Sequence, residues 1–310
     1  MSGATRERAS VFAPASVGIS VTSLASDGSS YCAILTSGIV DCWGSNSSGD
    51  LGIGTTAGPD TCPGYGVHPE PCSTTAVSTG FSATSLMGAA GDYCAILTSS
   101  SGLDCWGDNT EGELGDGSST GPDTCEFAQP CSTAPASVGI SATSVVGNGA
   151  TSCAILTSGA VDCWGQNANG ALGDGTTGGP DACYSATHPL PCSTTPVSTG
   201  ISATTLSTDG SGFCAILTSS SGLDCWGANY YGQVGNGSNT GPETCLGGAC
   251  STAPLSTGVT ATSVASDGYG YCAIITSGAA DCWGNNYDGE LGDNSTTNSY
   301  SPVPVLGINP

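Results

Sequence analysis

Short apolar stretches alternate with polar and glycine-rich turns along this chain, and the whole pattern recurs. Each unit has an alternating stretch such as residues 21–25, a Gly-rich turn, the apolar run Cys-Ala-Ile-(Leu/Ile)-Thr, and the string Asp-Cys-Trp-Gly. Period-two alternation between turn residues predicts β-strands. The sequence therefore predicts an all-β repeat protein with five units, marked by Trp43, Trp106, Trp164, Trp226 and Trp283.

Within each unit, the apolar run and the following Asp-Cys-Trp-Gly string predict a β-hairpin. A three-residue loop at residues 36–38 places Cys32 opposite Cys42, with Gly38 where a type I turn plus bulge needs a left-handed residue. Opposed Cβ atoms lie about 4.5–5.5 Å apart, close to disulfide geometry. In units two and four the turn gains one serine and the cysteine spacing gains one residue. That covariation predicts a disulfide across each hairpin.

The first four units carry a second cysteine pair, which closes a loop that begins Gly-Pro-(Asp/Glu)-x-Cys. Structural zinc sites are the alternative use of these cysteines, but the chain has no CxxC knuckle and only two histidines. Disulfides persist in oxidising compartments, so the location predicted is extracellular or the cell surface. The nine predicted bridges are Cys32–Cys42, Cys62–Cys72, Cys94–Cys105, Cys125–Cys131, Cys153–Cys163, Cys183–Cys192, Cys214–Cys225, Cys245–Cys250 and Cys272–Cys282.

After the hairpin, each unit continues with Gly-x-Asn-x-x-Gly-x-(Leu/Val)-Gly and ends in a Pro/Val segment. This pattern resembles the RCC1-like repeat of the regulator of chromosome condensation, over residues 14–305, and is similar to secreted bacterial members of that family. The resemblance implies a β-propeller of four-stranded blades around a channel. We expect a tail at 1–13 and one disulfide-stapled propeller at 14–310, with five blades at about 14–73, 74–134, 135–193, 194–253 and 254–310.

The number of outer-strand segments exceeds the number of units by one. Six Pro/Val segments accompany five units, from Pro14 to Val305, whereas the usual ring of the family has seven blades. We expect strand exchange between the two termini to close the ring. A part of a larger ring, or pairing of the spare strand with another molecule, is the alternative.

Composition excludes several classes of partner. The chain of 310 residues has a net charge of −23 and only two basic side chains, Arg6 and Arg8. Nucleic-acid binding and attachment to anionic membranes both need lysine and arginine, so neither is expected. No apolar run reaches the about 18 residues of a membrane span, and no signal peptide is visible at the N-terminus. Another protein, a cell-surface component or a further copy of this chain remains as partner.

Residue patterns that carry catalysis are missing. His68 and His188 lie in loops of non-adjacent units, without a serine or cysteine nucleophile at recognisable spacing. The resemblance does not carry over chromatin binding or nucleotide exchange, because the basic contacts are absent; secreted relatives, including a β-lactamase inhibitor, are protein-binding modules. We expect a non-catalytic binding or recognition module outside the cell. The alternative is a structural subunit of an extracellular filament or surface layer, assembled through terminal strands.

The two residues inside Asn-x-x-Gly differ in every unit, although the flanking residues are constant. A constant scaffold with varied loop tips is typical of a binding surface, and exposed tyrosines are suited to anchor a partner. The alternative is that these tips are simply unconstrained. The predicted binding residues are Glu111, Tyr230, Tyr231, Tyr287 and Asp288.

Carboxylates gather in the loops of units two and five, as hard cations prefer. Neither loop matches the twelve-residue calcium loop, so solvated acidic loops are the alternative, and no other cofactor is expected. The candidate calcium ligands are Asp108, Glu111, Glu113 and Asp116 in one loop and Asp288, Glu290 and Asp293 in the other.

Overall fold

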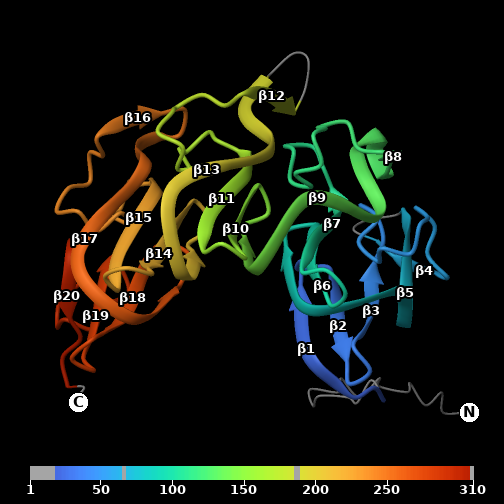
Figure 1. Ribbon diagram of the computed structural model, residues 1–310, viewed down its shortest axis with the longest axis horizontal. Helices are drawn as coiled ribbons and strands as arrows, with labels where there is room; N and C mark the ends of the chain where they lie inside the picture. Colours follow the sequence, from blue (N-terminus) through green and yellow to red (C-terminus); the bar gives the residue numbers. More distant parts are fainter. Residues whose placement is uncertain (1–17, 65–67, 185–188, 308–310) are drawn as a thin grey trace, which may run out of the picture.

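The repeated hairpins fold as the alternation predicts. In the computed structural model, which describes residues 18–64, 68–184 and 189–307, every regular element is a β-strand except one short 3₁₀ turn, η1 (Glu126–Ala128). No helix in these ranges is long and apolar enough to cross a bilayer. The strands form five antiparallel blades that follow one another in sequence order (Figure 1).

Each blade has four main strands. Blade 1 contains β1 (Val21–Ser26), β2 (Ser30–Leu35), β3 (Ile39–Ser45) and the first part of β5 (Pro69–Ala89). Blade 2 contains the end of β5, β6 (Asp92–Leu97), β7 (Gly102–Asp108) and the first part of β9 (Pro130–Gly147). Blade 3 contains the end of β9, β10 (Thr151–Leu156), β11 (Ala160–Gln166) and the first part of β13 (Pro189–Thr208). Blade 4 contains the end of β13, β14 (Gly212–Leu217), β15 (Gly222–Ala228) and the first part of β17 (Gly248–Ser266). Blade 5 contains the end of β17, β18 (Gly270–Ile275), β19 (Ala280–Gly284) and β20 (Ser299–Pro304).

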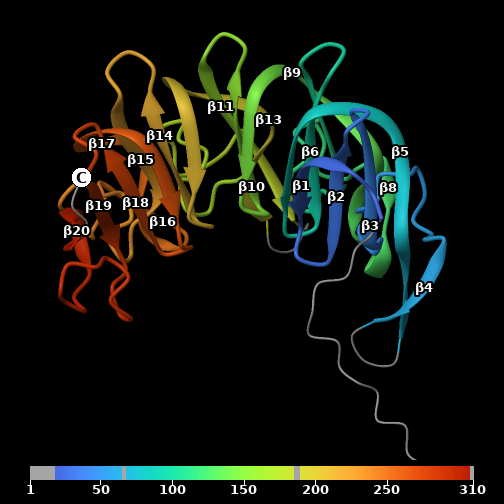
Figure 2. The same cartoon turned by 90° about the horizontal axis from the view of Figure 1, so that it is seen from below.

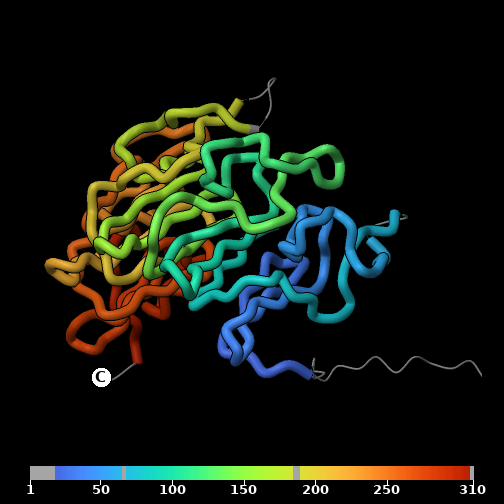
Figure 3. The backbone as a smooth tube through the Cα atoms, turned by 45° about the vertical axis from the view of Figure 1, so that its right-hand side comes forward, coloured from blue at the N-terminus to red at the C-terminus, as the bar shows by residue number. Residues whose placement is uncertain are grey.

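Four long strands connect the blades, because each is the outer strand of one blade and the inner strand of the next. In β5, residues 72–82 pair with β3, and residues 83–89 pair with β6. Figure 3 traces this passage of the chain from blade to blade. The repeat limits expected near residues 73, 134, 193 and 253 lie inside these shared strands.

The predicted disulfide pairing is confirmed for all eighteen cysteines, and no cysteine is free among the described residues. Cys32 stands directly opposite Cys42, with their Cα atoms 4.1 Å apart. Gly38 has the predicted positive φ, of 90°. Where the turn gains a residue, Ser101 and Ser221 take the left-handed position at φ 56° and 55°. Nine bridges fit an oxidising environment.

The second set of bridges fastens four short strands to the outer strands of blades 1 to 4. These strands are β4 (Asp60–Pro63), β8 (Asp123–Thr124), β12 (Asp181–Tyr184) and β16 (Glu243–Cys245). Each pairs with the beginning of the long strand that follows it, which creates a stapled hairpin beside the blade. Blade 5 has no such hairpin among the described residues.

Contacts between successive blades form the apolar core. Side chains alternate between the two faces of strand two: in β2, Cys32 and Ile34 face blade 2, where they cluster with Tyr93 and Trp106. The tryptophan of blades 2 to 5 is buried and donates its indole N–H to a loop carbonyl of the preceding blade. The pairs are Trp106 with Asp50 (2.9 Å), Trp164 with Glu113 (2.7 Å), Trp226 with Ala171 (2.9 Å) and Trp283 with Gln233 (2.7 Å).

The five blades form an open arc (Figures 1 and 2). The ends of all five inner strands line one central opening, among them Ser26, Gly88 and Gly147. The expected ring closure is not observed in the described chain. The outer position of blade 5 is filled by β20, so that blade offers no vacant edge on β19 for an N-terminal strand. Residues 14–17, the predicted spare segment, lie outside the described residues.

Replacement of Trp164 by phenylalanine tests the contribution of the interblade hydrogen bond. The change removes the indole donor and leaves the buried Glu113 carbonyl unsatisfied, so we expect a loss of about 2 kcal/mol or more in the free energy of unfolding. Trp43→Phe is the matched control, because Trp43 has no preceding blade in the described chain; we expect less than about 1 kcal/mol. Denaturant titration measures both, and equal losses would contradict this account.

Candidate binding surface

One buried asparagine per blade shapes the loop that follows strand three. Asn46 is fully buried, and its side-chain carbonyl accepts a hydrogen bond from the Leu51 amide at 3.0 Å. Its amide group donates to the carbonyls of Thr55 and Ala57, both at 2.9 Å. Asn109, Asn167, Asn229 and Asn286 each accept the same i+5 bond. The asparagine thus fixes the loop from inside and leaves its two tip residues free to vary.

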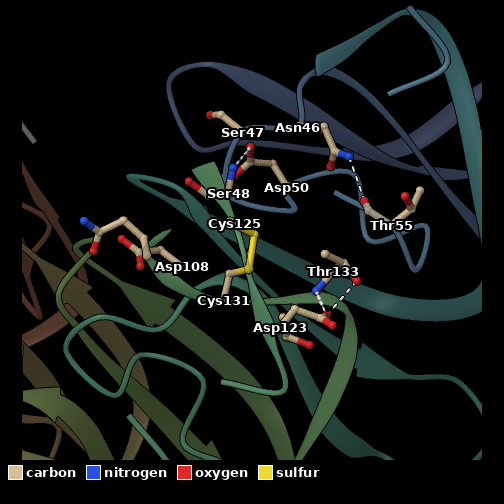
Figure 4. Close-up of a disulfide and its surroundings, with 12 residues drawn as sticks. Asn46, Ser47, Ser48, Asp50, Thr55, Asp108, Asp123, Cys125, Cys131 and Thr133 are labelled. Atoms are coloured by element: carbon tan, nitrogen blue, oxygen red, sulfur yellow. Dashed lines mark hydrogen bonds between the residues drawn. A yellow bond between two sulfur atoms is a disulfide. The ribbon is translucent and has the colours of Figure 1, made fainter. Parts of the chain in front are cut away.

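The stapled hairpins of blades 2 and 4 contact the loop of the preceding blade. The Glu126 amide in blade 2 donates to the Ser47 carbonyl of blade 1 at 3.1 Å, and the Gly247 amide in blade 4 donates to Ala168 of blade 3 at 3.2 Å. Figure 4 shows the Cys125–Cys131 bridge with Ser47 and the rest of that loop beside it. Loop tips and stapled hairpins therefore form one continuous face at one end of the blades.

Three tyrosines from blades 4 and 5 form an aromatic cluster on this face. The Tyr231 ring meets the Tyr269 ring edge-to-face at 5.9 Å and the Tyr287 ring at 6.3 Å. Tyr269 and Tyr287 are 60% and 69% exposed. The cluster contains two of the predicted binding residues, and Asp288 adjoins it in the chain. An exposed aromatic cluster of this kind is the usual anchor of a protein interface.

Sequence reasoning missed Tyr269, although the repeat carried a signal for it. Tyr269 stands in the turn before strand two, where the other units have Ser29, Gly91, Ala150 and Ser211. A large aromatic residue at a position otherwise reserved for small ones marks a local departure from the scaffold.

The other predicted binding residues lie apart from this cluster. Tyr230 points toward blade 3, where its hydroxyl donates to the Asn169 side chain at 3.0 Å, and burial raises its pKa. Glu111 is half-buried between blades 2 and 3. Burial raises its pKa above the ordinary value, and a hydrogen bond from Gln166 offsets part of this rise.

A groove of about 620 Å³ lies at the opposite end of the arc, between the stapled hairpins of blades 1 and 2. Its walls include Ser47, Glu70 and the Cys62–Cys72 bridge. Phe127 borders it, 81% exposed and with a positive φ of 57°. An exposed aromatic side chain on strained backbone is a feature of functional loops, and the motif analysis did not find it.

The candidate calcium loops use their carboxylates in turns. Asp108 accepts hydrogen bonds from the amide and the hydroxyl of Thr110, at 3.0 and 2.5 Å. In blade 5, Glu290 accepts the Asp288 amide at 2.8 Å. Among the residues that the structure describes, no group of three or more acidic, histidine or cysteine side chains is placed to share an ion. Three further candidates accept amide hydrogens in the same way: Glu113 from Glu111, Asp116 from Ser118 and Asp293 from Ser295.

Buried carboxylates also gather around blade 2 and its boundary with blade 1, where basic groups are lacking. Asp50 and Asp92 are each 1% exposed and Glu113 is 3% exposed, with Asp27 and Asp108 close enough to act on them. Both carboxylate oxygens of Asp92 and one of Asp50 have no hydrogen-bond partner. The described residues include no lysine or arginine. Comparison of the repeats would have revealed this site, because the other units carry serine, threonine or glycine at the position of Asp92.

Burial is the main cause of a strongly shifted pKa at each of the three buried carboxyls. It raises the pKa of Asp92 well above the ordinary value, and repulsion from Asp108, Asp27 and Asp50 raises it further. Burial raises the pKa of Asp50 in the same way, and repulsion from Asp27 raises it further. Burial also raises the pKa of Glu113, and there the main repulsion comes from Asp108. These groups favour the protonated form in the folded state.

No family model matches the chain. Solved structures with a similar backbone include yeast RCC1 (Prp20) bound to Kap60, at TM-score 0.68 and 16% identity over 94% of this chain and 62% of that one. Human WBSCR16 matches at TM-score 0.65 and 16% identity, over 92% of this chain and 67% of that one. Prp20p from Saccharomyces cerevisiae matches at TM-score 0.64 and 15% identity, over 94% and 64%. The chain thus spans less than two thirds of Prp20, and its fold is an RCC1-like β-propeller.

The raised pKa values predict a protein that is most stable in acid. A carboxyl whose folded pKa is raised contributes stability that is complete below its unfolded pKa of about 4 and is lost as pH rises through the folded value. Burial raises the pKa of Asp209 to about 6, so the contribution of this group to folding stability is lost between about pH 4 and 6. We expect the melting temperature to fall across this range and beyond.

Asp92→Asn should raise the melting temperature at pH 8 by a few degrees and change it little at pH 4, because the amide carries no charge to bury. Asp288→Asn is the exposed control, with no expected effect at either pH. Differential scanning calorimetry measures both, and destabilisation of the Asp92 variant at pH 8 would contradict the burial argument.

Proposed function

We propose that this protein is a non-catalytic binding module of the cell surface or extracellular space, and that the face of loop tips and stapled hairpins is its contact surface. The observation that carries this proposal is the exposed cluster of Tyr231, Tyr269 and Tyr287, built on loops whose backbone is fixed by buried asparagines. Rigid loops lower the entropic cost of binding, because little of the contact surface must be ordered on association.

Proteins of the same fold support a protein partner. Prp20 is described in complex with Kap60, and its binding to Gsp1p and histones has been characterised. Only the general use of this fold for binding proteins is transferred to this chain, because the sequence identity is 16% or lower. The net charge of −23 disfavours polyanions and favours a partner whose contact surface is neutral or basic.

The nine disulfides support an extracellular role, because they would not persist in a reducing cytosol. Four of them also fix the stapled hairpins of the contact face, with sequence separations of five to ten residues. Assembly through terminal strands, the alternative role, has less support: β20 pairs with β19 inside its own blade.

Selection of a displayed peptide library on the immobilised protein tests the contact surface. We expect enriched peptides to lose affinity at least tenfold on Tyr269→Ser and on Tyr287→Ser, because a hot-spot aromatic residue contributes about 1.4 kcal/mol or more. Biolayer interferometry measures the dissociation constants.

Ile39→Ser is the matched control, because Ile39 is 39% exposed at the opposite end of its blade. Peptides that bind all three variants like the wild type would show that the tyrosine cluster is not the contact surface.

A further inference from the structure

The first and last blades expose the two halves of a contact that the molecule makes four times internally. At each internal boundary, the tryptophan of one blade packs on the Cys/Ile face of the blade before it. In blades 2, 4 and 5 a second aromatic ring stacks on that tryptophan. Blade 1 has the aromatic face and no blade before it, and blade 5 has the Cys/Ile face and no blade after it, in the described chain.

The aromatic face of blade 1 consists of Tyr31 and Trp43, stacked with their ring centroids 5.8 Å apart. Tyr31 is 46% exposed, whereas its counterparts Tyr93 and Phe213 are fully buried and Tyr271 is 3% exposed. Leu24 and Val21 extend the same apolar surface at 55% and 42% exposure. The Trp43 indole is the only one of the five that donates no interblade hydrogen bond among the described residues.

The Cys/Ile face of blade 5 is open in the same way. Ile274 is 49% exposed, whereas its four counterparts, exemplified by Ile34, are 3–4% exposed. A pocket of about 230 Å³ lies on this blade and is lined in part by Cys272, Glu290 and Leu291. A cavity of about 150 Å³ suffices for benzene. Glu290 occupies the position whose carbonyl accepts the indole in blades 1 to 4.

The end of the chain covers part of this face. At the other boundaries, the glycine after the loop leucine touches the incoming tryptophan, as Gly52 touches Trp106. In blade 5, Gly292 faces Val305 instead, and the Leu306 amide donates to the Gly292 carbonyl at 2.9 Å. Cys272 and Ile274 nevertheless stay exposed beside it, so the cover is partial.

We infer that blade 1 of one copy docks on blade 5 of a second copy, with Trp43 entering the pocket beside Leu291 and donating to the Glu290 carbonyl. The occupant is a second copy because both halves of the contact are in this chain, and because the contact continues an interface already used at every internal boundary. The two faces differ, so the contact is heterologous: copies close into a ring or extend as a chain according to the rotation between them. The inference does not depend on the proposed binding function.

The net charge of the chain gives this association a distinctive salt dependence. Two copies, each with a charge of −23, repel one another at low ionic strength, and salt screens that repulsion within about 10 Å at 0.1 M and 3 Å at 1 M. The contact itself is apolar and keeps its strength in salt. Association should therefore strengthen as sodium chloride is raised.

Sedimentation velocity of the purified protein tests the inference. Between 20 mM and 1 M sodium chloride, we expect a concentration-dependent rise from one chain of 30.0 kDa to dimers or larger multiples. Trp43→Ser and Ile274→Asp should each weaken association at least tenfold, and Tyr31→Asp serves as a second variant of the aromatic face. Circular dichroism melts check that each variant is folded.

Mixing the two single-face variants distinguishes this contact from any other. A Trp43→Ser copy keeps an intact blade 5 face and an Ile274→Asp copy keeps an intact blade 1 face, so a mixture should form dimers and nothing larger. Leu246→Ser, at an exposed apolar site of blade 4, should associate like the wild type. A wild-type monomer at all salt and protein concentrations, or a mixture that stays monomeric, would overturn the inference.

Discussion

The contact between an indole and the carbonyl of the preceding blade is the interaction on which the rest of this structure depends. A blade of three or four short strands cannot bury both its faces by itself, and this chain has only 38% hydrophobic residues. In blades 2 to 5, the tryptophan fills the space between two sheets with one large side chain and fixes their relative position through one directed hydrogen bond. Because the acceptor lies in the loop held by the buried asparagine, blade packing and loop shape are linked.

That link explains why the candidate contact surface is rigid although it consists of loops. Cross-hairpin disulfides fasten the scaffold strands, and the second set of bridges fastens the hairpins that cover the preceding loops. Tyr231 therefore meets Tyr269 and Tyr287 on a preformed surface. The same close packing is unfavourable around blade 2, where Asp50, Asp92 and Glu113 are buried and the described residues offer no basic partner.

The open arc follows from the same repeated contact. Every internal boundary uses an aromatic face and a Cys/Ile face, so any arc of such blades that is not closed exposes one of each. Tyr31 of blade 1 and Ile274 of blade 5 are therefore exposed. A terminal repeat with polar faces would cap such an array, but neither end of the described chain is polar in this way.

The sequence by itself determined the local structure of this protein. Hairpins, turn types and all nine disulfides follow from spacings of five to eleven residues, because both partners lie in one repeat and chain geometry limits where they meet. Tertiary structure alone decided what happens between blades: the approach of Tyr269 to Tyr231, the burial of Asp92 beside Asp50, and the open arc in place of the expected closed ring. Those contacts join residues that are tens of positions apart and belong to different repeats. They involve the variable positions, which the repeat pattern does not specify. The physical reason is that periodicity specifies each blade, whereas the packing angle between blades specifies which variable residues meet.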